Sequence, residues 1–339
     1  MATAQQIIAL LNSHVQGDQE QFLSIALQVA AGEARSGRKD TADQLRRLVQ
    51  AARSGAAQRA TVKSAESGAI PLARPRGELQ TLLSTQYPKL RLSQMVLEPV
   101  TVTRLEDLLE QQRQRDLLRE HGKVPSSRIL LAGPPGSGKT MTAAAIAGEL
   151  HLPLFSVRLD ALITRYLGET ASKLRLIFDH IAATRGVFLF DEFDAIGGHR
   201  GADNDVGEMR RILNSFLQFM EEGNSTDSVI IAATNHPELL DHALARRFDD
   251  VIVYGLPDAK AAKRVIEQHL GTFRPRQVQW AKIIPSAEGL SHAEIARAVD
   301  EVIKRAILAG AGAARSADVA STLAARQQAK SALSGKREV

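Results

Sequence analysis

The chain has 339 residues, of which 44% are hydrophobic and 24% charged, which is typical of a folded globular protein with two or three domains. Its 43 basic and 38 acidic residues give a formal net charge of only +5, so nucleic-acid binding is not expected. There are no cysteines, which excludes disulfides, thiolate metal sites and cysteine nucleophiles. The amino terminus lacks the pattern of a signal peptide. We therefore expect a cytoplasmic protein that does not bind membranes.

The first 78 residues divide into a patterned and an unpatterned stretch. Residues 1–54 carry apolar side chains at helical spacing, in stretches punctuated by Gly17-Asp18 and Ser36-Gly37, which predicts an N-terminal three-helix domain. Residues 55–78 are rich in small residues and arginine and have few large apolar ones, which predicts a flexible linker.

The central part, residues 79–256, alternates short apolar strands with helical segments. The expected strands span 129–132, 154–157, 187–190, 229–233 and 251–254. Such alternation predicts an α/β fold, a parallel sheet flanked by helices. Residues 257–339 show helical periods alone, so a small all-helical domain should follow the sheet.

The segment after the first of these strands fits the phosphate-loop pattern G-x-x-x-x-G-K-[ST]. It reads Gly133, Pro134, Pro135, Gly136, Ser137, Gly138, Lys139 and Thr140. In such a loop the glycines let backbone N–H groups face phosphate oxygens, the lysine supplies charge, and the hydroxyl binds Mg²⁺. A plain glycine-rich turn is the alternative. The apolar strand before the loop and the helix-forming run from Met141 after it favour the phosphate loop, so ATP and Mg²⁺ are the expected cofactors.

Two further strands end in polar residues that suit hydrolysis. The strand 187–190 is followed by Asp191, expected to hold Mg²⁺ through water, and Glu192, expected to polarise the attacking water. The strand 229–233 leads to Asn235, which could orient that water. Acidic residues are also common in loops, and Asn235 could instead cap a helix that begins near Glu238.

The segments Ala233–Asp241 and Ala243–Asp249, together with the loop and the carboxylates, resemble the AAA branch of the AAA+ ATPases over residues 90–310. This resemblance implies that Arg246 and Arg247 reach the γ-phosphate bound by a neighbouring subunit. It therefore implies a homo-oligomer, a hexameric ring or a helical version of one. The adjacent arginines look more like katanin and spastin than membrane-anchored proteases. Alternatively, Arg246 and Arg247 only stabilise the C-terminal end of a helix through its dipole.

The resemblance also implies a loop that contacts substrate in the central channel. Tyr166, Leu167 and Gly168 stand where AAA proteins grip an extended polypeptide. A second channel loop is expected at 197–201. The alternative for Tyr166 is packing within its own subunit.

In the helical domain, the segment Gly289–Ile295 resembles the stretch that lies beside adenine and ribose in the family. It places His292 and Ala293 near the nucleotide, and His292 replaces the usual glycine. No arginine stands in this segment, where other AAA+ branches add one. By the same resemblance His269 lies near the nucleotide, unless it is a surface histidine, and Val96 closes over adenine.

We therefore expect an ATP hydrolase of the AAA branch, similar to the katanin- and spastin-like or the protease-associated members. It should unfold, remodel or disassemble protein substrates through pore loops. The resemblance in layout to the disassembly enzymes implies that residues 1–54 recruit a substrate, an adaptor or a partner protease. The first alternative is a nucleotide-dependent switch that gates a partner such as a protease without threading. Others are a nucleic-acid remodelling ATPase and a scaffold without turnover. No His-Glu-x-x-His occurs in the sequence, so any proteolysis would need a separate partner.

Overall fold

The computed structural model describes residues 75, 77–163, 167–194, 203–222, 226–237 and 242–334. All of these belong to one compact unit. The predicted helical domain 1–54 and most of the predicted linker 55–78 lie outside the described residues, and both stay predictions.

A six-stranded sheet forms the centre of the α/β part, with strand order β1-β3-β4-β5-β2-β6. The strands are β1 (Leu83–Gln86), β2 (Arg128–Ala132), β3 (Leu154–Val157), β4 (Val187–Phe190), β5 (Val229–Thr234) and β6 (Asp250–Val253). The five predicted strands are parallel. β1 was not predicted, because its sequence LSTQ has no apolar run; it pairs antiparallel with β3 at one edge.

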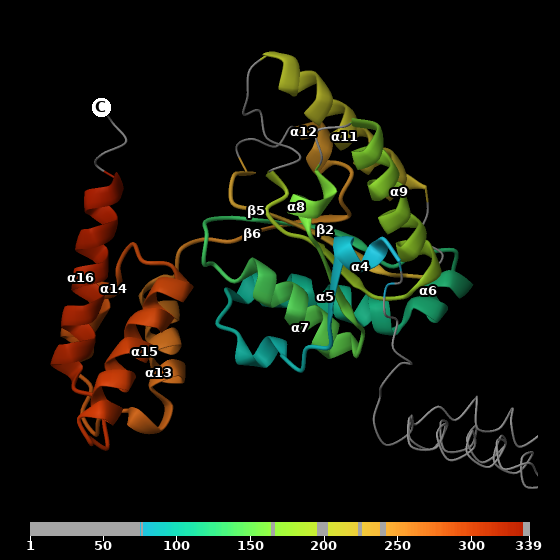
Figure 1. The fold of residues 1–339 in the computed structure, drawn as a ribbon. Coiled ribbons are helices and arrows are strands. Elements are labelled where there is room, and N and C mark those ends of the chain that lie inside the picture. The colour runs from blue at the N-terminus through green and yellow to red at the C-terminus, as the bar shows by residue number, and fades with distance from the viewer. Residues whose placement is uncertain are drawn as a thin grey trace, which may run out of the picture. The chain divides into compact units, whose positions relative to one another are not determined.

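Helices cover both faces of this sheet, as Figure 1 shows. On one face α5 (Pro99–Arg113) and α7 (Lys139–Leu150) pack on one set of strand side chains, and on the other α9 (Leu167–Ala183) and α11 (Asp203–Glu221) pack on the alternate set. The central strands β4 and β5 are buried along their whole length, as expected for parallel strands covered on both sides. The fold class predicted for the sheet is confirmed.

Shorter elements connect these layers. They are α4 (Leu79–Leu82), η1 (Leu92–Gln94), α6 (Arg115–Glu120), α8 (Leu159–Leu162) and α12 (His242–Ala245).

The residues after β6 form a helical part with its own core, as predicted. Its elements are α13 (Ala259–Leu270), η3 (Gly271–Phe273), α14 (Trp280–Ala287), α15 (His292–Leu308) and α16 (Ser316–Ser334). The core gathers apolar side chains of α13, α14, α15 and α16, among them Ile266, Ile283, Val299 and Leu323. None of the helices in the described ranges is both long and apolar enough to cross a membrane.

The start of α15 is fixed by its own sequence. Ser291 is the N-cap; its hydroxyl accepts a hydrogen bond from the backbone N–H of Glu294, whose carboxylate accepts one from the N–H of Ser291. This capping box satisfies two backbone donors that a helix start would otherwise leave open. It therefore places His292 and Ala293 in the first turn of the helix.

Candidate active site

The loop between β2 and α7 has the backbone that the glycine pattern predicts. Gly133, Gly136 and Gly138 have φ angles of 150°, 77° and 105°, which favour glycine over other residues. No side chain caps the start of α7 at Gly138. The first N–H groups of this helix are therefore left to a ligand, and the helix dipole favours an anion there.

Lys139 lies inside the loop and is only 6% exposed. Its ammonium donates hydrogen bonds to the carbonyl oxygens of Gly133 at 2.7 Å and Pro134 at 2.9 Å, and to Oδ1 of Asn235 at 2.9 Å. Burial lowers the pKa of Lys139 from its ordinary value, and the carboxylates of Asp191 and Asp194 oppose the shift. The loop therefore holds a partly desolvated cation that a phosphate can approach.

The carboxylates after β4 lie at the same edge of the sheet as the loop. The hydroxyl of Thr140 donates a 2.6 Å hydrogen bond to Oδ2 of Asp191. The next residue, Glu192, has a φ of 52°, which is uncommon for a residue other than glycine and is often found at functional sites. The structure thus brings the predicted hydrolytic carboxylates beside the end of the loop.

Asp194, which sequence reasoning did not single out, holds the end of β5. Its Oδ1 accepts hydrogen bonds from the hydroxyl of Thr234 at 3.0 Å and the backbone N–H of Asn235 at 3.3 Å. The Asn235 side chain accepts from Lys139. The helix expected near Glu238, which Asn235 could cap, lies outside the described residues.

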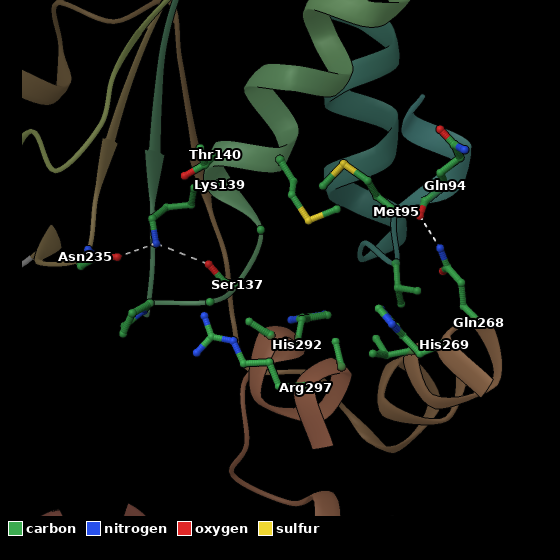
Figure 2. Close-up of a pocket in the computed structure, with 18 of the residues that line it drawn as sticks. Gln94, Met95, Ser137, Lys139, Thr140, Asn235, Gln268, His269, His292 and Arg297 are labelled. Atoms are coloured by element: carbon green, nitrogen blue, oxygen red, sulfur yellow. Dashed lines mark hydrogen bonds between the residues drawn. The ribbon is translucent and has the colours of Figure 1, made fainter. Parts of the chain in front are cut away.

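A cavity of about 520 Å³ opens between the loop and the helices α13 and α15 (Figure 2). The predicted residues that line it are Val96, Pro135, Gly136, Ser137, Gly138, Lys139, Thr140, Met141, Asp191, Glu192, Asn235, His269, His292 and Ala293. Lining residues that were not predicted are Gln94, Met95, Val265, Gln268, Ala296 and Arg297. The volume is in the ordinary range for small-molecule sites.

Two contacts join the helical part to the α/β part around this cavity. The backbone N–H of Ala293 donates to the carbonyl oxygen of Gly136 at 3.0 Å, and Nε2 of Gln268 donates to the carbonyl oxygen of Gln94 at 2.6 Å. Figure 2 shows the cavity between them, with Lys139 and Asn235 at one end and Gln268 and His269 at the other. The cavity thus has a phosphate-loop end and an opposite end lined by Met95, Gln268 and His269.

The two histidines of the cavity differ in their surroundings. Nδ1 of His269 lies 3.4 Å from Oδ1 of Asp300. His292 is half-buried, and its Nδ1 has no hydrogen-bond partner. Burial lowers the pKa of His292, and the charge of Glu98 opposes this, so the site favours the neutral ring.

Several predicted residues lie away from the cavity or outside the described ranges. Arg246 and Arg247 follow α12, are exposed and do not line the cavity, and Arg247 forms an ion pair with Glu221. Tyr166 and the predicted second channel loop 197–201 lie outside the described residues. Leu167 and Gly168 begin α9, and only their backbone is described.

The arrangement fits a nucleoside triphosphate. Loop N–H groups, a buried ammonium and a helix start face the same end of the cavity, which suits a phosphate chain. Among the residues that the structure describes, no cluster of three or more metal-binding side chains occurs. Thr140 and Asp191 suit Mg²⁺, because this ion is bound by one or two protein oxygens together with phosphates and water.

Comparison with known proteins agrees with this geometry. The model of the "ATPase family associated with various cellular activities (AAA)" matches residues 129–256, which contain the loop, the carboxylates and Arg246. An uncharacterised AAA family ATPase of Sinorhizobium fredii, y4kL, is 33% identical over 308 residues, which cover 91% of this chain and 90% of that protein.

A second group of relatives matches 53% of this chain. The ATP-dependent zinc metalloprotease FtsH of Haemophilus influenzae is 38% identical over 187 residues, or 53% of this chain and 29% of FtsH. FtsH of Photobacterium profundum is 38% identical over 188 residues, or 53% of this chain and 27% of that protein. The nearer likeness to katanin and spastin stays a prediction. The full-length match to y4kL, together with the phosphate loop, shows that the chain belongs to the AAA family of ATPases and is an ATP hydrolase.

Proposed function

We propose that this ATPase assembles into a hexameric ring, or a helical version of one, and uses ATP hydrolysis to unfold, remodel or disassemble protein substrates. The observation that carries the proposal is the position of Arg246 and Arg247, which are exposed and lie outside the cavity of their own chain. Arginine at a phosphoryl-transfer site raises the rate by about 10³ to 10⁵. Because neither Arg246 nor Arg247 lines the cavity of its own chain, a neighbouring subunit would bring them to a bound phosphate.

The residues of the cavity divide the work of hydrolysis. Lys139 and the loop N–H groups hold the phosphate chain, and Thr140 and Asp191 are placed to hold Mg²⁺, which would neutralise developing charge on the phosphates. Glu192 polarises the attacking water as general base, and Asn235 orients that water. Arg246 and Arg247 of the neighbouring subunit stabilise charge on the γ-phosphate in the transition state.

Mixing two inactive variants tests the shared site. Lys139→Ala removes the ammonium that binds phosphate and leaves Arg246 and Arg247 in place. Arg246→Ala leaves the cavity complete and removes one of these two arginines. We expect each variant alone to hydrolyse ATP poorly and the mixture to regain part of the activity after subunit exchange. Labelled subunits show whether the two variants exchange. If they exchange and the ATPase rate of the mixture is only the sum of the two separate rates, each site is complete within one chain and the ring proposal fails.

The choice of a protein substrate rests on Tyr166, Leu167 and Gly168, which follow α8 in the chain where the resemblance implies a channel loop. FtsH, similar over 53% of this chain, is named as a protease, which supports action on proteins. We further propose that residues 1–54 recruit the substrate or a partner through the linker 55–78, before the ATPase part 79–256 and the helical part 257–339, and that the protein acts in the cytoplasm.

A Tyr166→Ala variant separates threading from the second candidate, a switch that gates a partner protease. A threading enzyme should lose substrate remodelling and keep hydrolysis, because the Tyr166 side chain is proposed to contact the substrate and not ATP. A switch should keep hydrolysis and keep regulating its partner, because it does not thread substrate. The readouts are the unfolding of a fluorescent protein fused to a bound client and the activity of the gated partner, measured beside phosphate release. Unchanged regulation of the partner by Tyr166→Ala, with no unfolding by the parent chain, would favour the switch.

A further inference from the structure

The cavity carries a cation that the predicted hydrolytic machinery does not use. Four of the residues that line it carry formal charge, namely Lys139, Arg297, Asp191 and Glu192. Asp191 is placed to hold Mg²⁺ and Glu192 to polarise water, so Lys139 and Arg297 are the two charged side chains of the lining that suit the phosphates themselves. Lys139 belongs to the phosphate loop, which leaves Arg297 without an assigned role.

The position of Arg297 follows from the docking of α15 on the loop. Ala293 donates its N–H to Gly136 at 3.0 Å, and Arg297 follows four residues later, on the same face of the helix. Figure 2 shows the guanidinium on the loop side of the cavity, below Ser137 and Lys139, while Gln268 and His269 lie at the other end. The side chain thus points to the end where phosphates are expected.

Within the part of the chain that the structure describes, no protein group binds the guanidinium of Arg297. It makes no hydrogen bond or ion pair there and is exposed to the cavity. The other arginine of α15, Arg305, forms an ion pair with Glu301 and contacts the hydroxyl of Thr322 at 3.5 Å. Arg297 is therefore available to a ligand, whereas Arg305 supports the packing of α15 and α16.

We propose that Arg297 binds the phosphate chain of the nucleotide held by its own chain, from the helical side of the cavity. A guanidinium presents paired N–H donors that match two phosphate oxygens. This role is separate from that of Arg246 and Arg247, which complete a neighbour's site. It also links α15 to the phosphates, so the bound nucleotide holds the helical part against the loop. The inference concerns the ATP site itself and does not depend on ring assembly or threading.

The test compares Arg297→Ala with Lys304→Ala, which removes a cation of the same helix that does not line the cavity. Binding of the full chain to adenosine, ADP and the non-hydrolysable β,γ-imido analogue of ATP is measured by calorimetry, with Mg²⁺. We expect Arg297→Ala to weaken binding of both phosphate-bearing ligands by about tenfold or more, as for a hydrogen-bonded charge, and to leave adenosine binding unchanged. Arg297→Lys should fall between, because it keeps the charge and loses the paired donors.

Three results would overturn the proposal. If Arg297→Ala weakens the binding of adenosine and of the triphosphate analogue equally, Arg297 only maintains the shape of the cavity. If it weakens binding no more than Lys304→Ala does, Arg297 has no role in binding. Because Arg297 is exposed and unpaired, the thermal midpoint of the unliganded variant should match that of the parent chain. A lowered midpoint, with binding lost for all three ligands, would also reject the inference.

Discussion

The hydroxyl of Thr140 and the carboxylate of Asp191 meet at 2.6 Å, which joins the first turn of α7 to the end of β4. Hydroxyl and carboxylate oxygens are ligands that Mg²⁺ prefers, and here they lie beside the loop that faces phosphate. The hydrogen bond between them holds both oxygens in place before a nucleotide arrives. The Mg²⁺ requirement of the enzyme can therefore be tested by removing one atom, the hydroxyl oxygen of Thr140.

Thr140→Val removes the hydroxyl and keeps the shape of the side chain. We expect the Mg²⁺ concentration for half-maximal hydrolysis to rise by at least about tenfold, in line with the loss of oxygen partners at metal sites, because one Mg²⁺ ligand and the anchor of Asp191 are both lost. The measurement is the rate of phosphate release as Mg²⁺ is titrated at fixed ATP. Thr103→Val, at an exposed position of α5, is the control. An unchanged titration for Thr140→Val would remove Thr140 from the metal site.

The phosphate loop shows how much of this site the sequence predicts. Its residues form one local segment, and their spacing alone specifies a turn into a helix, so the loop geometry was foreseeable. Asp194 was not, because its role depends on hydrogen bonds to Thr234 and Asn235, about 40 residues away. β1 was missed for a related reason, since its pairing with β3 stabilises a polar segment.

The helical side of the cavity was predicted in part. A resemblance to the family indicated His292 and Ala293, yet Arg297 lies outside the matched segment 289–295. The signal that could have found it is the helical repeat: a residue four positions after Ala293 shares its face. Gln268 was missed because its contact with the carbonyl oxygen of Gln94 joins segments that are far apart in sequence.

Glu192→Gln tests the assignment of the general base. Gln has nearly the same shape, so the backbone with a φ of 52° should persist, but the amide cannot accept the proton. We expect phosphate release to fall by about 10² to 10⁴, with the affinity for ADP unchanged. Single-turnover hydrolysis and equilibrium binding measure the two effects. Glu106→Gln, on the exposed side of α5, should have neither. Near-normal turnover by Glu192→Gln would assign the base to another residue.

Gly136→Ala tests the fit between the loop and α15. A Cβ at this position would lie 2.8 Å from Oγ of Ser291 and 3.0 Å from Cβ of Ala293, on a backbone with a φ of 77°. We expect ADP binding to weaken by more than about tenfold, because the loop and the start of α15 must separate to make room for the added Cβ. A tenfold loss of affinity corresponds to about 1.4 kcal/mol of binding free energy. Calorimetry of ADP binding gives the readout.

The matched control for the loop is Gly122→Ala, where φ is 68° and no atom lies within 4 Å of the added Cβ. That substitution carries the backbone strain without the clash, so it should lower the free energy of unfolding by about 1–2 kcal/mol and leave ADP binding unchanged. Equal ADP affinity for Gly136→Ala and the parent chain would show that the loop does not need this close approach.

His180, which lies beside the stacked rings of Phe155 and Phe188, should make stability depend on pH. The ring of His180 lies 5.2 Å from that of Phe155 and 6.0 Å from that of Phe188, its Nε2 is buried without a partner, and burial lowers its pKa below the ordinary 6.5. The unfolded chain therefore takes up a proton more readily than the folded one. The stabilising contribution is complete above pH 6.5 and is lost as the pH falls from there through the folded pKa.

We expect the free energy of unfolding of the parent chain to decrease between pH 7 and pH 5, and His180→Phe to decrease less, because phenylalanine fills the same space and does not ionise. Denaturant titrations at several pH values measure both slopes. His121→Phe, at an exposed position, should keep the parent's slope. His292 also has a pKa lowered by burial, so part of the slope should remain in His180→Phe. A His180→Phe slope equal to that of the parent would show that His180 is not the group that titrates.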